Sequence, residues 1–119
     1  MTRKPRKRRN DRNHLVYKLT CSEDGSFYIG VTFIEQRSAE KSLRRRWLAH
    51  QRNALRYNKQ ELLSQTIRKH GPETFTREVL QIVRGKQACH DLERELIQEL
   101  RPHLNMEGMG RKKTSKKEN

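Results

Sequence analysis

The sequence predicts a small α/β domain of the α+β kind, in which a three-stranded antiparallel or mixed sheet is flanked by helices in the order β-β-α-α-β-α. Three observations predict this class. Two short runs of alternating apolar residues are separated by an Asp-Gly turn. Two segments with helical periodicity follow, and a β-rich run then precedes a last helical segment. A length of 119 residues is typical of one such domain.

The first two strands are expected at residues 14–20 and 26–32. Apolar and aromatic side chains alternate with their neighbours in both runs, as on the two faces of a strand. They are Leu15, Tyr17 and Leu19 in the first run and Phe27, Ile29 and Val31 in the second. Asp24-Gly25 between the runs is a strong turn signal, because glycine accepts a positive φ without a Cβ clash. These features predict a β-hairpin.

Two helices are expected after the hairpin, at residues 39–57 and 60–69. Ser38 is a candidate N-cap for the first helix, and Asn58 marks its end. Four residues of this helix recur at helical spacing and predict its buried face: Leu43, Trp47, His50 and Ala54. The second helix is expected to end at Gly71, which can adopt a left-handed cap, before Pro72, which cannot continue a helix.

A third strand is expected at residues 75–83, and a last helix at residues 87–100 that ends before Pro102. The apolar residues of the strand fall on both faces, so we expect the sheet to be covered on both sides there. These residues are Val79, Leu80, Ile82 and Val83. The helix carries two adjacent stripes, which are Ala88, Leu92, Leu96 and Leu100 in one and Cys89, Glu93 and Ile97 in the other.

The charge of the chain is strongly positive and unevenly distributed. Lys and Arg number 28 against 14 Asp and Glu, the formal net charge is +14, and only 31% of the residues are hydrophobic. Residues 1–13 contain seven Lys or Arg and one Asp, and residues 111–119 contain five and one Glu. Segments with so little to bury do not fold by themselves. We therefore expect disordered basic arms at residues 1–13 and 108–119 around one domain at residues 14–107.

The basic arms predict a nucleic acid as the partner and no membrane association. No apolar run of about 18 residues is present, and no apolar signal segment follows the basic start. The arms also lack an amphipathic helix with an aromatic anchor. We therefore assign phosphate contacts to Arg6, Lys7, Arg8 and Arg9 and expect a cytoplasmic protein.

Three groups of residues could carry chemistry. Arg46 and His50 lie four positions apart, roughly 40° apart around a helix. A guanidinium beside an imidazole suits a phosphodiester, because the first binds phosphate oxygens and the second moves a proton. The hairpin contributes Tyr17 and Tyr28, and the last helix contributes Glu93. Each feature alone also has an ordinary structural explanation, such as a solvated helix face or a strand-packing aromatic residue.

Together these features resemble the GIY-YIG nuclease family, and in particular its small phage homing endonucleases. Leu15-Val16-Tyr17 and Tyr28-Ile29-Gly30 are similar to the two halves of the family's hairpin motif. The remaining similar segments are Arg46-Trp47-x-x-His50, Lys69-His70-Gly71-x-x-x-Phe75, Glu93-x-x-x-Ile97 and Pro102-x-x-Asn105. They occur in the family's order and cover about residues 14–107.

The sequence departs from the family pattern in two places. Leu15 replaces the leading glycine of the hairpin motif, and the stretch between Gly30 and Arg46 is longer than in the compact phage enzymes. In addition, we expect no separate DNA-recognition domain in a chain of this length. The protein would then be weakly selective for sequence, act as a homodimer, or depend on a partner protein for specificity.

The resemblance implies a metal-dependent DNA endonuclease that nicks or cuts DNA by phosphodiester hydrolysis. Glu93 would hold Mg²⁺ or Mn²⁺, and Arg46 would bind the scissile phosphate. Tyr17 would be the general base, with its pKa lowered by nearby cations, while Tyr28 positions water or phosphate and His50 assists proton transfer. Gly30 would let the backbone approach the ligand closely, and Asn105 would support the site by hydrogen bonds. Arg44, Arg45 and Lys69 would contact DNA.

Three alternatives remain open from the sequence. Composition alone favours a non-catalytic basic nucleic-acid-binding protein, and the missing leading glycine leaves open a degenerate nuclease that only binds DNA. A zinc protein that uses Cys89, His90 and His103 lacks a fourth ligand. Magnesium-dependent nicking of plasmid DNA separates these alternatives. The expected setting is a bacterial or phage-infected cell.

Overall fold

The computed structural model describes residues 12–35 and 37–105 and contains the predicted elements in the predicted order. The strands are β1 (Asn13–Cys21), β2 (Phe27–Phe33) and β3 (Phe75–Arg84). The helices are α1 (Ala39–Leu55), α2 (Leu62–His70) and α3 (Lys86–Leu100), with short 3-10 turns at Pro72–Thr74 and His103–Asn105. Residues 1–11 and 108–119 of the expected basic arms lie outside the described residues, whereas Arg12 is described and Asn13 already belongs to β1. Within the described part of the chain, no helix is long and apolar enough to cross a membrane.

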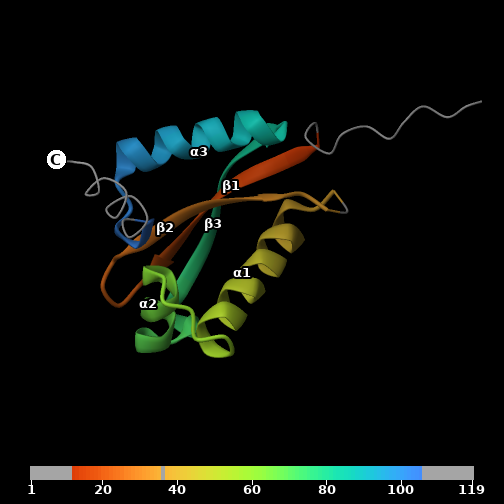
Figure 1. Cartoon of the computed structure of the whole chain (residues 1–119). Helices are drawn as coiled ribbons and strands as arrows, with labels where there is room; N and C mark the ends of the chain where they lie inside the picture. Colours follow the sequence, from red (N-terminus) through yellow and green to blue (C-terminus); the bar gives the residue numbers. More distant parts are fainter. Residues whose placement is uncertain (1–11, 36, 106–119) are drawn as a thin grey trace, which may run out of the picture.

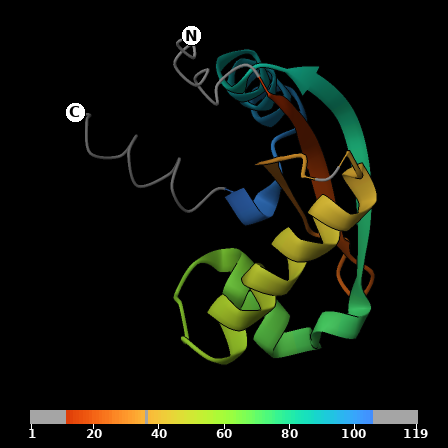
Figure 2. The ribbon, with the colours of Figure 1, turned by 90° about the vertical axis from the view of Figure 1, so that its right-hand side faces the viewer.

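The three strands form one antiparallel sheet in the order β2-β1-β3 (Figure 1). Helix α3 covers one face of this sheet, and α1 and α2 cover the other (Figures 1 and 2). The expectation of a three-stranded sheet flanked by helices is therefore confirmed, with the antiparallel alternative observed.

The central strand β1 supplies most of the core, because it is covered on both faces. Leu15, Tyr17 and Leu19 are fully buried against α1 and α2, in a cluster with Trp47. Val16 points to the other face and is buried with Ile29 of β2 and Cys89 of α3. A register shift between Val16 and Tyr17 in the pairing with β3 marks a bulge beside the tyrosine. Such irregularities change the direction of a side chain, and this one lies next to the candidate site.

Local signals in the sequence explain the turns. Gly25 has φ +75°, and the Asp24 carboxylate accepts hydrogen bonds from the backbone N–H and hydroxyl of Ser26. Ser38 caps α1 by accepting from the backbone N–H of Lys41. Gly71 follows α2 with a positive φ of 94°, but its ψ of 143° is extended and not that of the left-handed cap we expected.

Two packing predictions were wrong. Strand β3 is an edge strand that is exposed over most of its length, including Val79 and Ile82, and is not covered on both sides. The reason is the strand order, which gives the doubly covered central position to β1. In α3, Ala88 and Leu100 of the expected stripe are exposed. The helix instead packs through Cys89, Leu92, Leu96 and Ile97.

Candidate active site

The candidate site lies along β2, where α1 on one face of the sheet and α3 on the other approach the same edge. A cavity of about 410 Å³ is lined there by Tyr17, Tyr28, Arg46 and Glu93. A second cavity of about 230 Å³ shares Tyr28 and Arg46 with the first and adds His50. Residues from β1, β2, α1 and α3 that are far apart in the sequence therefore meet in one region.

Tyr17 forms the centre of the hydrogen-bond network in this site. Its hydroxyl lies 2.8 Å from Nε2 of His50, and Nε of Arg46 donates to the same oxygen at 3.4 Å. Because the oxygen already accepts from Arg46, its own proton is available to His50. The ring of Tyr28 lies 6.2 Å from that of Tyr17 and 5.3 Å from that of His50, so the three rings form one cluster.

Burial controls the protonation of this cluster. Burial, with a smaller contribution from the charge of Arg46, lowers the pKa of His50 from 6.5 to about 3, so the imidazole is neutral at pH 7. Burial also raises the pKa of the Tyr17 phenol, and Arg46 counteracts only part of this shift. Arg46 therefore lowers the pKa of Tyr17 as expected, but desolvation is the larger effect, so the pKa is raised overall. At neutral pH, Tyr17 is a phenol that faces a neutral imidazole acceptor.

Glu93 brings negative charge to the opposite side of the cavity from α1. Its side chain is 22% exposed, and one carboxylate oxygen lies 3.2 Å from Nδ1 of His90, one helical turn before it. The charge of Glu93 raises the pKa values of both Tyr17 and Tyr28, which places the carboxylate within electrostatic reach of both phenols. A cation beside Glu93 would therefore also act on the two tyrosines.

Gly30 leaves the space that the two tyrosines occupy. It pairs with Tyr17 across the β1–β2 ladder, and a Cβ at this position would lie 2.6 Å from the Tyr17 hydroxyl oxygen. It would also lie 2.9 Å from a ring carbon of Tyr28. A side chain at residue 30 would displace the tyrosines, so this close approach requires glycine.

Asn105 supports β2 from the C-terminal end of the described chain. Its side-chain oxygen accepts from the backbone N–H of Ile29, and its amide donates to the carbonyl of the same residue, both at 2.9 Å. Ile29 lies between Tyr28 and Gly30, and the two backbone groups that bind Asn105 are on the edge of β2 that has no neighbouring strand. Asn105 therefore holds the strand that carries both residues.

Comparison with known proteins relates most of the chain to one nuclease family. The model of the GIY-YIG catalytic domain matches residues 13–107. The chain belongs to the GIY-YIG nuclease family. No curated protein and no solved structure matched in the same comparisons. Membership indicates an endonuclease, and a nuclease domain of this family implies DNA as the substrate.

The basic residues predicted for DNA contact in this GIY-YIG domain differ in availability. Arg44 and Lys69 are exposed. Arg45 forms an ion pair with Glu35 at 2.6 Å, donates to Thr32, and lies 4.5 Å from the ring centroid of Phe33. Its guanidinium therefore has partners within the protein. The arm residues Arg6, Lys7, Arg8 and Arg9 lie outside the described part of the chain.

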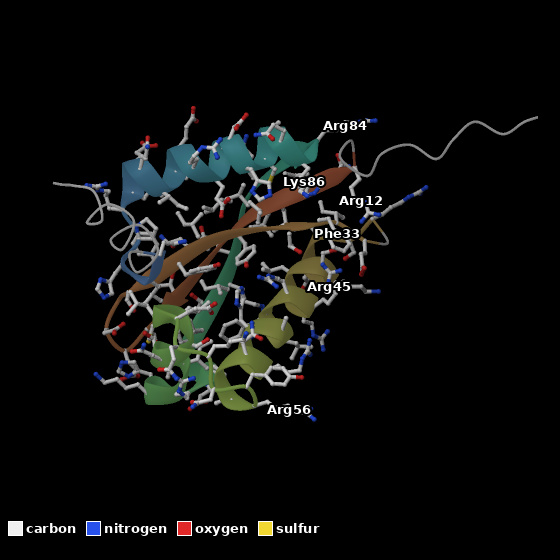
Figure 3. All side chains as sticks on the ribbon, viewed as in Figure 1. Arg12, Phe33, Arg45, Arg56, Arg84 and Lys86 are labelled. Atoms are coloured by element: carbon white, nitrogen blue, oxygen red, sulfur yellow. The ribbon has the colours of Figure 1, made fainter. Side chains whose placement is uncertain are left out.

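Basic side chains gather around Phe33 at the edge of the larger GIY-YIG cavity, and the sequence analysis did not predict this cluster. Figure 3 shows Arg12, Phe33, Arg45 and Lys86 together at the end of the sheet where β1 begins. Arg12 and Arg45 lie 4.6 and 4.5 Å from the Phe33 ring centroid, and Phe33 and Lys86 line the larger cavity. No sequence signal marked Lys86 or Phe33, because the two meet only after α3 folds back over β2.

His90 is a further cavity residue of the GIY-YIG site, which the sequence analysis named only as a candidate zinc ligand and did not place beside Glu93. It lines the cavity with Glu93 and lies three residues before it, so helical spacing alone could have placed both on one face. Asn53 and Glu61 line the smaller cavity, and no motif marked either one.

One group of residues in the described part of the chain could hold a metal ion through three side chains, which are Cys21, Asp24 and His70. Its ligand atoms all lie within 4.8 Å of one another. The zinc alternative from the sequence was wrong, because Cys89, His90 and His103 form no such group among the described residues. Cys89 is instead a core residue between α3 and the sheet.

Proposed function

We propose that this chain hydrolyses DNA phosphodiesters at the cavity lined by Tyr17, Arg46 and Glu93. The observation that supports this proposal is the meeting of a phenol, a guanidinium and a carboxylate in one cavity along β2. The three side chains come from separate elements, so their proximity depends on the fold. A basic protein that only bound DNA would have no need for a carboxylate beside a buried and a half-buried tyrosine.

The residues fit a divalent cation of the Mg²⁺ or Mn²⁺ type. Mg²⁺ keeps several of its waters and is typically bound by one or two carboxylates. Glu93 supplies one partly exposed carboxylate, and the cavity of about 410 Å³ leaves space for water around it. The His90 imidazole, 3.2 Å from one of its oxygens, helps to hold this carboxylate in place. When bound, such an ion polarises a phosphoryl oxygen and lowers the pKa of a bound water.

Arg46 is the residue that binds the phosphate in this proposal. It lines both cavities, so its guanidinium can reach a substrate in either. A guanidinium offers donors in a fixed geometry that suits phosphate oxygens, and its charge opposes the negative charge that develops in the transition state. Its Nε contact with Tyr17 fixes the side chain beside the base.

Tyr17 accepts the proton of the attacking water in this proposal, and His50 makes that transfer feasible. A phenol with a raised pKa is rarely ionised at pH 7, so a phenolate is not the resting base. The Tyr17 oxygen instead takes the proton of the water as the new bond to phosphorus forms. Its own proton passes along the hydrogen bond to Nε2 of His50, 2.8 Å away, and on to solvent through the smaller cavity, because the low pKa of the imidazole prevents it from keeping the proton. Tyr28 forms the wall against which the water and phosphate are positioned.

The remaining parts of the assignment extend this proposal to the whole chain. Residues 14–107 would be the nuclease domain, and the basic arms 1–13 and 108–119 would hold DNA through phosphate contacts without reading sequence. The protein would act in the cytoplasm of a bacterial or phage-infected cell, as an enzyme similar to a homing endonuclease. A homodimer or a partner protein would supply specificity.

Cleavage of supercoiled plasmid DNA tests the proposed function. We expect nicked or linear product with Mg²⁺ and none after chelation. Glu93→Gln should reduce the rate at least about 100-fold with DNA binding largely retained. Glu95→Gln, at an exposed position of the same helix, is the matched control and should cleave normally. Cleavage by Glu93→Gln at the original rate would overturn the metal assignment, and binding without cleavage by the unmodified chain would leave a DNA-binding protein.

A further inference from the structure

We infer that Cys21, Asp24 and His70 form a zinc-type metal site that joins the β1–β2 hairpin loop to the end of α2. The sulfur, carboxylate oxygen and imidazole nitrogen all lie within 4.8 Å of one another. The hairpin loop and the end of α2 are neighbours in Figure 1. None of the three residues lines either cavity of the proposed nuclease site, so this site is separate from Glu93.

The hairpin holds its two ligands in fixed positions. Cys21 ends β1, and its backbone N–H donates to the Ser26 carbonyl while its own carbonyl accepts from Gly25. One oxygen of Asp24 accepts both hydrogen bonds from Ser26, at 2.9 and 2.6 Å. The other carboxylate oxygen faces His70, with 3.5 Å between it and Nε2. One oxygen is therefore anchored while the other is directed toward the remaining ligands.

The segment after α2 holds the third ligand against the hairpin. His70 is the last residue of α2, and the chain turns at Gly71. The Thr74 hydroxyl donates to the Gly71 carbonyl at 2.7 Å and lies 3.6 Å from the Cys21 sulfur. The backbone N–H of Ser22 donates to the Thr74 carbonyl at 2.8 Å. A backbone hydrogen bond and a side-chain contact thus join the two segments at this point without a metal, so little reorganisation is needed to bind one.

The donor set selects the kind of ion. A thiolate, an imidazole and a carboxylate are the ligands that Zn²⁺ takes in proteins, and three protein ligands with a water complete a tetrahedral site. Mg²⁺ and Ca²⁺ prefer oxygen ligands and would gain little from the sulfur. The carboxylate and a thiolate together carry two negative charges, which a divalent ion neutralises.

The same atoms can also be interpreted without a metal. Asp24 and His70 would then be a partly exposed ion pair, and Cys21 would be a core thiol hydrogen-bonded to Thr74. The two interpretations differ in whether the sulfur is a ligand. A metal ion with a visible sulfur signature distinguishes them directly.

Titration of the reduced full-length chain with Co²⁺ provides this test. We expect one equivalent to bind tightly, with the near-ultraviolet thiolate-to-cobalt charge-transfer band and the visible bands of a tetrahedral site, and Zn²⁺ to remove both. The chain contains two cysteines. Cys21→Ser should abolish the charge-transfer band, whereas Cys89→Ser is the matched control and should retain it. Absence of the band, or its survival in Cys21→Ser, would overturn the proposal.

Two further variants keep the test decisive if Cys21→Ser does not fold. Asp24→Asn, at an exposed position, and His70→Gln should each weaken Co²⁺ affinity by about tenfold to hundredfold. Unchanged affinity in both would contradict the ligand assignment. Glu93→Gln should leave the cobalt spectrum intact, so the outcome for this site is independent of the outcome for the proposed nuclease activity.

Discussion

Replacement of Gly30 by alanine should separate activity from stability in this protein. The added Cβ would lie 2.6 Å from the Tyr17 hydroxyl oxygen, whereas ordinary contacts begin at 3.4 Å, so one group must move by roughly 1 Å. Tyr17 is fully buried in the core, and its hydroxyl is 2.8 Å from His50. A shift of this size would break that hydrogen bond and, by the usual sensitivity of reacting groups to position, lower cleavage about 100-fold.

Gly30→Ala should lower the free energy of unfolding by only about 1–3 kcal/mol, as is usual for an overpacked core, so the protein should stay folded while it loses activity. Gly25→Ala is the matched control, because a Cβ there meets nothing within 4 Å while φ +75° imposes about 1–2 kcal/mol of strain. Single-turnover plasmid nicking and urea unfolding should be measured on both variants. Full activity in Gly30→Ala, or an equal loss in Gly25→Ala, would refute the role assigned to the space beside Tyr17.

Three further predictions test other parts of the site. Asn105→Ala should lower the free energy of unfolding in urea titrations by about 1–3 kcal/mol, because both Ile29 backbone groups lose their partner. The control variant Gln98→Ala, at an exposed position, should change it by less than about 0.5 kcal/mol. The unfolded state binds a His50 proton between pH 6.5 and about 3 that the folded state does not, so stability should fall as pH decreases through this window, by up to about 1.4 kcal/mol per pH unit. His50→Gln should flatten this slope, and an equally steep slope would contradict the assignment. Deletion of residues 1–11, which include six Lys or Arg, should weaken DNA binding and reduce the dependence of log Kd on log salt; an unchanged slope would remove the arm from the binding account.

The fold was largely predictable from local sequence signals. Asp24-Gly25 predicted the hairpin, Ser38 the start of α1, and the spacing of Leu43 and Trp47 the buried face of that helix. These signals depend on neighbouring residues only, so a single sequence contains them. The burial of β3 failed as a prediction because it depends on strand order, which no residue of β3 specifies.

The candidate site was predictable in its residues but not in its electrostatics. Tyr17, Arg46 and Glu93 could be selected because their order along the chain resembles a family pattern, and the fold brings them to one cavity. The raised pKa of Tyr17 and the lowered pKa of His50 could not be predicted, because both follow from burial by residues distant in sequence. Lys86 and Phe33 were missed for the same reason, since their proximity depends on the path of α3 across the sheet.

The central claim is that Arg46 and Glu93 act together on one phosphodiester, and a double-mutant cycle of single-turnover cleavage tests it most directly. Arg46→Lys keeps the charge but loses the guanidinium geometry, and Glu93→Gln keeps the shape but loses the charge. Groups that act as a unit give non-additive losses, so the double variant should cleave little more slowly than the slower single variant. Losses that multiply, or single variants that cleave at the original rate, would contradict a shared site.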